Sequence, residues 1–180
     1  MSLRVEHGFE PVFDENSKVL ILGTMPSVKS REQGFYYGHP QNRFWRVIAA
    51  ITASGGTGAD TDSAIYVPQT IGEKRAMLLR AGIAVWDVLA ACEIEGSEDS
   101  SIRNPEPADL QTLLHNAPGI RAIFCNGDKA CKLYLKFFAA EAAAGGWPQA
   151  VKLPSTSPAN AAWDLSRLTE TWGIAISKYL

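Results

Sequence analysis

The stretch Lys18-Val19-Leu20-Ile21-Leu22-Gly23-Thr24-Met25-Pro26-Ser27 decides the fold, because an unbroken apolar run ends abruptly in a turn. Residues 19–22 are typical of a buried strand. Gly23 and Pro26 mark the point beyond which the sheet cannot continue. The loop that follows should therefore lie at the carboxyl end of a strand, where open α/β sheets bind their ligands.

Three more short apolar runs follow along the chain, and longer helical patterns separate them. The runs occupy residues 83–86, 122–125 and 151–153. This alternation predicts a parallel sheet with crossover helices. The expected helices occupy residues 43–51, 71–80, 110–114, 128–144 and 163–179. We therefore predict an α/β fold, a three-layer α/β/α sandwich with a central four-stranded, mainly parallel sheet.

Two segments lack any periodicity, and we expect both to be surface loops. Residues 52–69 are rich in Gly, Thr and Ser, and we predict that this loop is mobile. Residues 91–107 contain acidic residues, serines and prolines. Gly82 comes just after the predicted helix of residues 71–80 and is the expected C-cap of that helix.

Length and composition favour one domain, residues 1–180, because 180 residues with 46% hydrophobic content can bury a single sizeable core. The net charge of −2 excludes a protein that coats nucleic acid by bulk charge, so any nucleic-acid contact must be local. No run approaches the roughly 20 apolar residues of a membrane span. Arg4, Glu6 and His7 interrupt any signal-peptide core. We expect a soluble, cytoplasmic monomer.

The cysteines favour neither a disulfide framework nor a metal cluster. Cys92, Cys125 and Cys131 are an odd set without a close CxxC pair, so we interpret them as buried structural thiols. No second His or Cys lies at ligand spacing from His39. We therefore predict no bound metal and no cofactor.

Two loops carry the side chains that point to a function. Gly34-Phe35-Tyr36-Tyr37-Gly38-His39-Pro40-Gln41-Asn42-Arg43-Phe44-Trp45 combines aromatic, amide and basic groups, which a site that grips a flat polar ring needs. Pro154-Ser155-Thr156-Ser157-Pro158-Ala159-Asn160 follows the fourth predicted strand and could cap the next helix or hold phosphates. Parallel topology places the turns after the first and fourth strands on the same rim of the sheet.

These segments resemble the uracil-DNA glycosylase superfamily. Residues 23–27 are similar to its first motif, Gly-x-[Asn/Asp/Ala]-Pro-[Gly/Ser/Tyr]. Residues 34–45 are similar to Gly-Phe-x-Phe-x-His-Pro-x-Asn-Arg-Phe-Trp of the mismatch-specific branch. Residues 155–160 look like the second motif, [His/Asn]-Pro-Ser-[Pro/Gly]-x-[Ser/Asn].

Two departures from these motifs suggest one branch. Met25 stands where the best-known branches have an Asn or Asp that positions the attacking water, which a thioether cannot do. Ser155 stands where they often have His, and we assign it to the catalytic set. Loss of both groups resembles the hypoxanthine-DNA glycosylase branch, the sixth family, also called DNA-deoxyinosine glycosylases. The resemblance implies that Asn42 carries the catalytic work.

Such an enzyme must flip the damaged base out of the duplex and stack it on an aromatic face. The resemblance implies that Tyr37 is this stacking group, with Thr24, Met25 and His39 also against the base. Asp87 closes the second strand near the position of a base-reading amide, where a carboxylate would accept the N–H of hypoxanthine or uracil. The alternatives are packing of Tyr37 on the sheet, a loop hydrogen bond for His39 and loop capping by Asp87.

Asn42 offers a donor and an acceptor, so it could hold the water, bond the base or simply cap the following helix. A turn role is the better interpretation of Asn126, which ends the third strand. The side chains expected to contact DNA are Ser27, Ser157 and Asn160, with charge from Lys29 and Arg43. For Lys29 and Arg43, the alternative is a solvent-exposed basic edge that makes no contact with DNA.

We therefore expect a monofunctional glycosylase that acts on deaminated bases in double- or single-stranded DNA, with hypoxanthine preferred on grounds of resemblance. The mechanism would be hydrolytic, because neither motif contains a lysine to form a Schiff base. The alternatives are a uracil or mismatch-specific glycosylase and a non-catalytic protein that binds DNA lesions.

Overall fold

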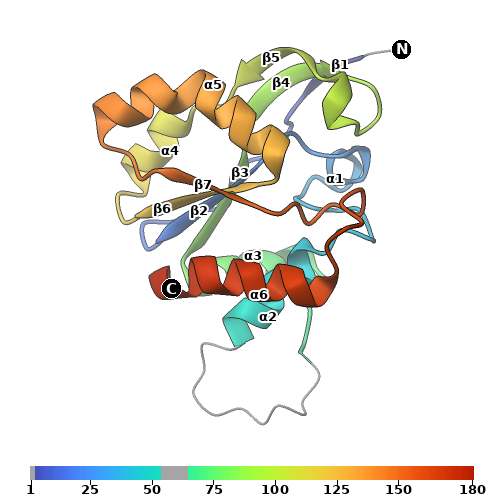
Figure 1. The fold of residues 1–180 in the computed structure, drawn as a ribbon, viewed down its shortest axis with the longest axis vertical. Helices are drawn as coiled ribbons and strands as arrows, with labels where there is room; N and C mark the ends of the chain where they lie inside the picture. Colours follow the sequence, from blue (N-terminus) through green and yellow to red (C-terminus); the bar gives the residue numbers. More distant parts are fainter. Residues whose placement is uncertain (1–2, 54–64) are drawn as a thin grey trace.

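A computed structural model describes residues 3–53 and 65–180 of the chain (Figure 1). The strands are β1 (Leu3–Glu6), β2 (Val19–Gly23), β3 (Ile83–Asp87), β4 (Leu89–Ile94), β5 (Arg103–Pro107), β6 (Ala122–Asn126) and β7 (Ala150–Leu153). The α-helices are α1 (Val28–Gln33), α2 (Phe44–Ala53), α3 (Ile71–Ala81), α4 (Leu110–Asn116), α5 (Asp128–Gly145) and α6 (Leu165–Ile176). Two 3₁₀ turns are η1 (Asp99–Ser101) and η2 (Ser177–Tyr179).

The central sheet has the strand order β3-β2-β6-β7, and each neighbouring pair is parallel. Gly23 at the end of β2 lies opposite Asp87 at the end of β3. Asn126 at the end of β6 pairs with Leu153 at the end of β7. The predicted four-stranded sheet is confirmed, and all four strands end at one edge.

Helices cover both faces of this sheet, which confirms the three-layer prediction. Helices α2, α3 and α6 form one layer, while α4 and α5 form the other (Figure 1). Ile21 of β2 belongs to the cluster that contains Phe44 and Trp172, and Leu20 belongs to the cluster that contains Tyr134. Successive β2 residues thus enter opposite cores, which explains why this strand is apolar throughout.

The interpretation of residues 91–107 as a surface loop was wrong. Strands β4 and β5 lie in this region and pair antiparallel, and β1 pairs antiparallel with the other edge of β4. Together they form a second, three-stranded sheet at one end of the molecule (Figure 1). The segment was missed because β4 pairs with the distant β1 and only irregularly with β5, and strand formation depends on such partners more than on local propensity.

Local signals set the ends of several helices. Thr70 and Glu73 form a capping box at the start of α3. Gly82 adopts φ +70° and caps the end of α3, as predicted. Of the predicted loop 52–69, residues 54–64 lie outside the described part of the chain. In the described ranges, no helix is long and apolar enough to cross a membrane.

Candidate active site

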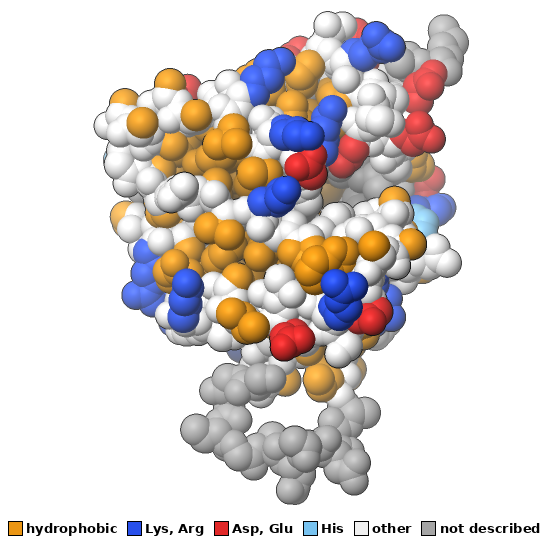
Figure 2. Space-filling view, in the orientation of Figure 1, with side chains coloured by type: hydrophobic (Ala, Val, Ile, Leu, Met, Phe, Trp, Pro, Cys, Tyr) orange, Lys and Arg blue, Asp and Glu red, His pale blue; other side chains and the backbone are white. Residues whose placement is uncertain are grey.

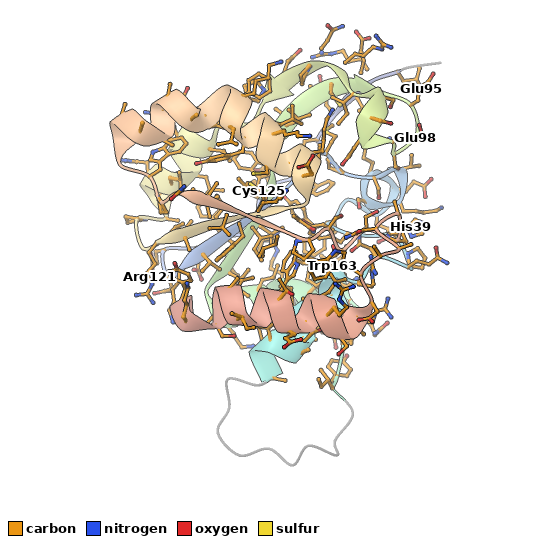
Figure 3. All side chains as sticks on the ribbon, viewed as in Figure 1. His39, Glu95, Glu98, Arg121, Cys125 and Trp163 are labelled. Atoms are coloured by element: carbon orange, nitrogen blue, oxygen red, sulfur yellow. The ribbon has the colours of Figure 1, made fainter. Side chains whose placement is uncertain are left out.

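A pocket of about 870 Å³ opens at the carboxyl edge of the central sheet. In the space-filling view, the surface is hollowed close to a pale-blue histidine near the right edge (Figure 2). Figure 3 labels His39 and Glu98 at that same edge, and both line the pocket. The structure brings almost all the predicted site residues to this pocket: Thr24, Met25, Ser27, Lys29, Tyr37, His39, Asn42, Asp87, Ser155, Ser157 and Asn160.

Tyr37 stands in this pocket in an unusual backbone conformation. Its φ is +52°, a left-handed value that is costly for a bulky side chain and recurs at functional sites. One ring face stacks on Phe44, with centroids 3.8 Å apart and an interplanar angle of 19°. The ring is half-buried and lines the pocket, so its other face is available to a planar ligand.

The Tyr37 hydroxyl is buried and has no hydrogen-bond partner of normal geometry among the described residues. Burial and the nearby Asp87 carboxylate raise the pKa of this phenol, and the proximity of Asn126 only partly opposes them. The group is therefore a neutral hydroxyl without a protein partner, which costs stability in the free protein.

Asn42 both caps a helix and faces the pocket. Its Oδ1 accepts hydrogen bonds from the Phe44 backbone N–H at 3.0 Å and from the Thr156 hydroxyl at 2.9 Å. A carboxamide oxygen has two lone pairs, so both are used. The amide nitrogen donates to no described protein group and is the part of Asn42 left for a ligand.

A chain of hydrogen bonds from Asn126 through Thr156 sets the orientation of the Asn42 amide. Asn126 accepts the Thr156 backbone N–H at its Oδ1, at 2.9 Å, so its Nδ2 is the atom that meets the Thr156 hydroxyl, also at 2.9 Å. The hydroxyl accepts this hydrogen and can then donate only its own, to Asn42. Thr156 is fully buried, which protects the chain from competing water.

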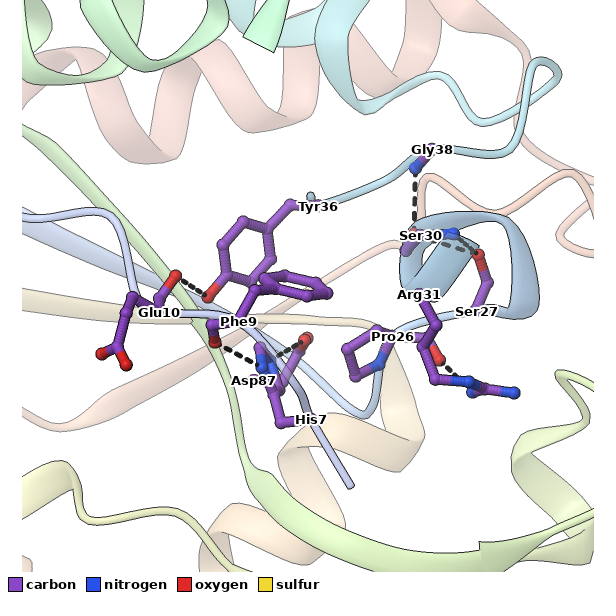
Figure 4. Close-up of polar contacts among 10 residues, drawn as sticks. All are labelled: His7, Phe9, Glu10, Pro26, Ser27, Ser30, Arg31, Tyr36, Gly38 and Asp87. Atoms are coloured by element: carbon purple, nitrogen blue, oxygen red, sulfur yellow. Dashed lines mark hydrogen bonds and ion pairs between the residues drawn. The ribbon is translucent and has the colours of Figure 1, made fainter. Parts of the chain in front are cut away.

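Asp87 is buried at the floor of the pocket with 4% exposure. Its Oδ2 lies 2.8 Å from Nε2 of His7, whose Nδ1 lies 2.8 Å from the Phe9 carbonyl (Figure 4). Its Oδ1 lies over Gly23, where an added Cβ would come within 2.2 Å. Gly23 therefore leaves the space that the carboxylate occupies.

Arg43 has a structural role in this fold, and its contact with DNA stays a prediction. Its guanidinium donates to the backbone carbonyls of Ser157, Asn160 and Trp163, and its Nε to that of Thr156. Arg43 does not line the pocket. Because the Arg43 guanidinium group already donates to four carbonyls, it has no pair of free N–H groups to offer a phosphate.

The other predicted DNA contacts lie at the start of α1 and on the loop after β7, and all of them line the pocket. Ser27 caps α1 and accepts the Ser30 N–H. Exposed Lys29 pairs with Glu32 at 2.8 Å. In the loop after β7, hydroxyls accept neighbouring N–H groups and an amide donates to a carbonyl, which fixes the loop shape at Ser155, Ser157 and Asn160.

The remaining predicted base contacts form one wall of the pocket. Met25 is buried in the core, and Thr24 donates to Asp99 at 3.2 Å. The Asp99 side chain still contacts solvent, although neighbouring protein removes enough water to raise the pKa of its carboxyl. His39 accepts the Gln41 N–H at Nδ1, which leaves Nε2 as the donor of the neutral ring.

No cluster of metal-binding side chains occurs in the part of the chain that the structure describes. The three cysteines are free thiols. Cys92 and Cys125 are buried, whereas Cys131 is half-buried. Burial raises the pKa of the Cys125 thiol, which makes it a poor ligand and nucleophile.

A model of the family described as the uracil DNA glycosylase superfamily matches residues 10–174. The chain belongs to this superfamily. The match covers the central sheet, the Tyr37 loop and the loop of Thr156. A superfamily DNA glycosylase acts on DNA, so the pocket at the sheet edge is the place to seek its base site.

Similar proteins include members from two Methanosarcina species. The chain is 37% identical over 125 residues, 69% of this chain and 73% of the other, to the hypoxanthine DNA glycosylase of Methanosarcina barkeri (strain Fusaro / DSM 804). It is also 37% identical over 127 residues to the hypoxanthine DNA glycosylase of Methanosarcina acetivorans, with 70% and 73% of the chains covered. A solution NMR structure of a candidate uracil DNA glycosylase from Methanosarcina acetivorans matches with a TM-score of 0.76 at 31% identity, over 98% and 99% of the chains.

Sequence reasoning missed three residues of this superfamily site. Thr156 was quoted only as one hydroxyl of a turn, Asn126 was given a turn role, and His7 was not linked to the site. The position of Asn126 at a strand end was a usable signal. No comparable signal pointed to His7, because its contact with Asp87 joins residues 80 positions apart.

Proposed function

We propose that this superfamily member hydrolyses the N-glycosidic bond of deaminated bases in DNA, with hypoxanthine as the preferred base. The observation that carries the proposal is a single pocket holding an aromatic face at Tyr37, a free amide donor at Asn42 and a buried acceptor at Asp87. A flipped lactam base needs these three functions for stacking, for leaving-group stabilisation and for recognition of its polar edge. The names of the two relatives support hypoxanthine as the base.

Asn42 would act as a hydrogen-bond donor to the departing base. Hydrolysis adds the hydroxyl of water to C1′ of the deoxyribose and breaks the bond to the base. The bonding electron pair leaves with the base, which ends with the remaining proton of the water. Because Asn42 Oδ1 is saturated by Phe44 and Thr156, its Nδ2–H groups can stabilise the negative charge that develops. This geometry disfavours Asn42 as the acceptor that holds the attacking water.

Tyr37 would hold the base by stacking, which contributes about 1–3 kcal/mol per base in comparable sites. The site pre-orders this ring, since its left-handed backbone and its contact with Phe44 fix its plane. Met25 would contribute apolar contact only, because its side chain packs in the core cluster below the pocket.

The test is single-turnover excision from labelled duplexes that carry deoxyinosine, deoxyuridine or deoxyxanthosine opposite the same base, followed by alkaline strand scission. We expect cleavage of the inosine strand to be fastest. Asn42→Ala should reduce the rate by about 10²–10³-fold, the usual cost of losing one such donor. Met25→Ala is the matched control on the same rim and should cost far less.

Three results would decide against the proposal. Faster release of uracil would replace hypoxanthine by uracil as the preferred base. Tight binding to inosine-containing DNA without base release, even at high protein concentration, would identify a lesion-binding protein. Equal, mild effects of Asn42→Ala and Met25→Ala would remove the role given to Asn42.

A further inference from the structure

At the floor of the pocket, buried His7 pairs with Asp87, and the proposed chemistry does not explain the role of His7. His7 lies just beyond β1 and has 7% exposure. Its ring packs against Phe9 and Tyr36, with centroid distances of 4.5 and 5.7 Å. Figure 4 shows the ring held between the Phe9 carbonyl and the Asp87 carboxylate. A residue far from both motifs in sequence thus reaches the base pocket through Asp87.

The hydrogen-bond pattern determines where the protons lie. The Phe9 carbonyl can only accept, so His7 Nδ1 carries a hydrogen. Between Nε2 and Asp87 Oδ2, at 2.8 Å, two lone pairs would repel, so one proton must lie on that line. It belongs either to an imidazolium beside a carboxylate or to a carboxylic acid beside a neutral ring.

In both arrangements, the second carboxyl oxygen of Asp87, Oδ1, carries no proton. Asp87 Oδ1 lies over Gly23 and accepts no hydrogen bond from the described residues. Since the proton is confined to the Oδ2 side, Oδ1 is an acceptor in either state. Without His7, a buried carboxyl could take up a proton on Oδ1 and become a donor to the pocket.

We infer that His7 is a positioning residue that keeps the pocket-facing oxygen of Asp87 an obligate hydrogen-bond acceptor, and that this acceptor selects bases with a ring N–H. Hypoxanthine and uracil carry such an N–H next to a carbonyl. Adenine and unsubstituted purine place a bare nitrogen there, whose lone pair repels an acceptor. The inference rests on the proposed function and gives it a mechanism of selection.

The experiment compares two purines of similar shape in matched duplexes. Deoxyinosine presents a ring N–H, and deoxynebularine presents a bare nitrogen at the same ring position. Single-turnover rates for both are measured with the full-length wild type and with His7→Leu. The readout is the ratio of the two rates. Loss of packing around His7 would slow both substrates together and leave this ratio unchanged.

We expect the wild type to favour inosine strongly and His7→Leu to lower the ratio by about 3–10-fold, the value of one hydrogen bond. His7→Gln should restore the ratio, because a Gln amide nitrogen can replace Nε2 as donor to Oδ2. This rescue separates a donor role from a packing role. Circular dichroism reports whether each variant is folded.

A second arm keeps the inference testable if His7→Leu does not fold. In Asp87→Asn, the amide nitrogen can donate to the bare Nε2 of neutral His7, which again leaves an oxygen towards the pocket. We expect this variant to slow both substrates but to keep their ratio. Asp87→Leu provides no acceptor and should lower the ratio.

The inference would be overturned by an unchanged ratio of inosine to nebularine rates in folded His7→Leu, or by a lowered ratio in Asp87→Asn. In both cases the wild type would still excise hypoxanthine. Absence of any hypoxanthine release by the wild type would instead overturn the proposed function, and this inference with it. The two failures are therefore distinguishable in one set of assays.

Discussion

The Thr156 hydroxyl donates to Asn42 Oδ1 at 2.9 Å and thereby turns the carboxamide nitrogen away from the protein's own acceptors. The same oxygen caps α2 through the Phe44 N–H. Capping and ligand binding were alternatives for Asn42 in the sequence, but one carboxamide can serve both because its two ends face different groups. The helix start thus fixes the orientation of the donor proposed for catalysis.

Asn42→Asp separates the acceptor role of the Asn42 side chain from its proposed donor role. An aspartate would still accept from Phe44 and Thr156, and an acid is a good helix cap, so the fold should remain intact. It offers no donor and places negative charge where the leaving base becomes negative. We expect single-turnover excision to fall by at least about 10²-fold, with thermal unfolding close to wild type.

Asn42→Ala is the control, because it loses both the cap and the donor. It should be similarly slow but less stable by about 0.5–2 kcal/mol, the usual cost of a lost cap. Retention of activity in Asn42→Asp would contradict the donor role.

Thr156→Val removes the hydroxyl that orients Asn42 and keeps nearly the same shape. The Phe44 N–H alone then orients the amide of Asn42, and the Asn126 donor loses its acceptor. We expect excision to fall by about 3–10-fold and the free energy of unfolding by about 1–3 kcal/mol, since a buried polar group is left unpaired. Thr156→Ser retains the hydroxyl and should recover the excision rate. Equal rates for the Val and Ser variants would show that this hydroxyl does not position Asn42.

The central sheet was predictable because its strands are fully buried and therefore apolar over their whole length. Residues 19–22, 83–86 and 122–125 each lie within one residue of the observed limits of β2, β3 and β6. Strands β1, β4 and β5 were not: β1 pairs with β4 about 90 positions later, and the pairing of β4 with β5 is interrupted by register shifts. A half-exposed strand has too weak a local pattern to reveal such a partner.

Most of the residues that line the pocket were predictable from the sequence, but their hydrogen bonding was not. The turns after β2 and β7, with Thr24 and Ser155, do line one pocket together with Tyr37 and Asn42, as expected from parallel strand topology. Which end of Asn42 faces that pocket depends on the direction of bonds from Thr156 and Asn126, which no spacing in the sequence encodes. Arg43 shows the same limit, since a basic residue within the motif of residues 34–45 gave no sign that it donates to four carbonyls.

Tyr37→Phe tests the buried hydroxyl at the pocket. The hydroxyl has no partner within the described residues, so its removal should raise the free energy of unfolding by up to about 1–3 kcal/mol. The aromatic face remains, and we expect excision to stay within a few-fold of wild type. Thermal melts and single-turnover rates measure both effects.

Tyr37→Leu is the matched variant, which keeps an apolar side chain at the same left-handed position but loses the aromatic face. Its base binding should weaken by about 1–3 kcal/mol. If Tyr37→Phe proved as defective as Tyr37→Leu, the hydroxyl itself would contact the base, and stacking alone would not describe the role of Tyr37.

Arg43→Lys tests whether the loop at residues 154–160 depends on the guanidinium fork. A lysine keeps the charge, but its ammonium has three donors at one point and cannot span carbonyls on both sides of the loop. Because those carbonyls include that of Thr156, loosening the loop should also disturb Asn42. We expect a lower melting temperature and slower excision, together with faster proteolysis near residues 154–163. A direct role of Arg43 in DNA binding would give a different result, namely weaker binding to undamaged DNA with an unchanged melting temperature.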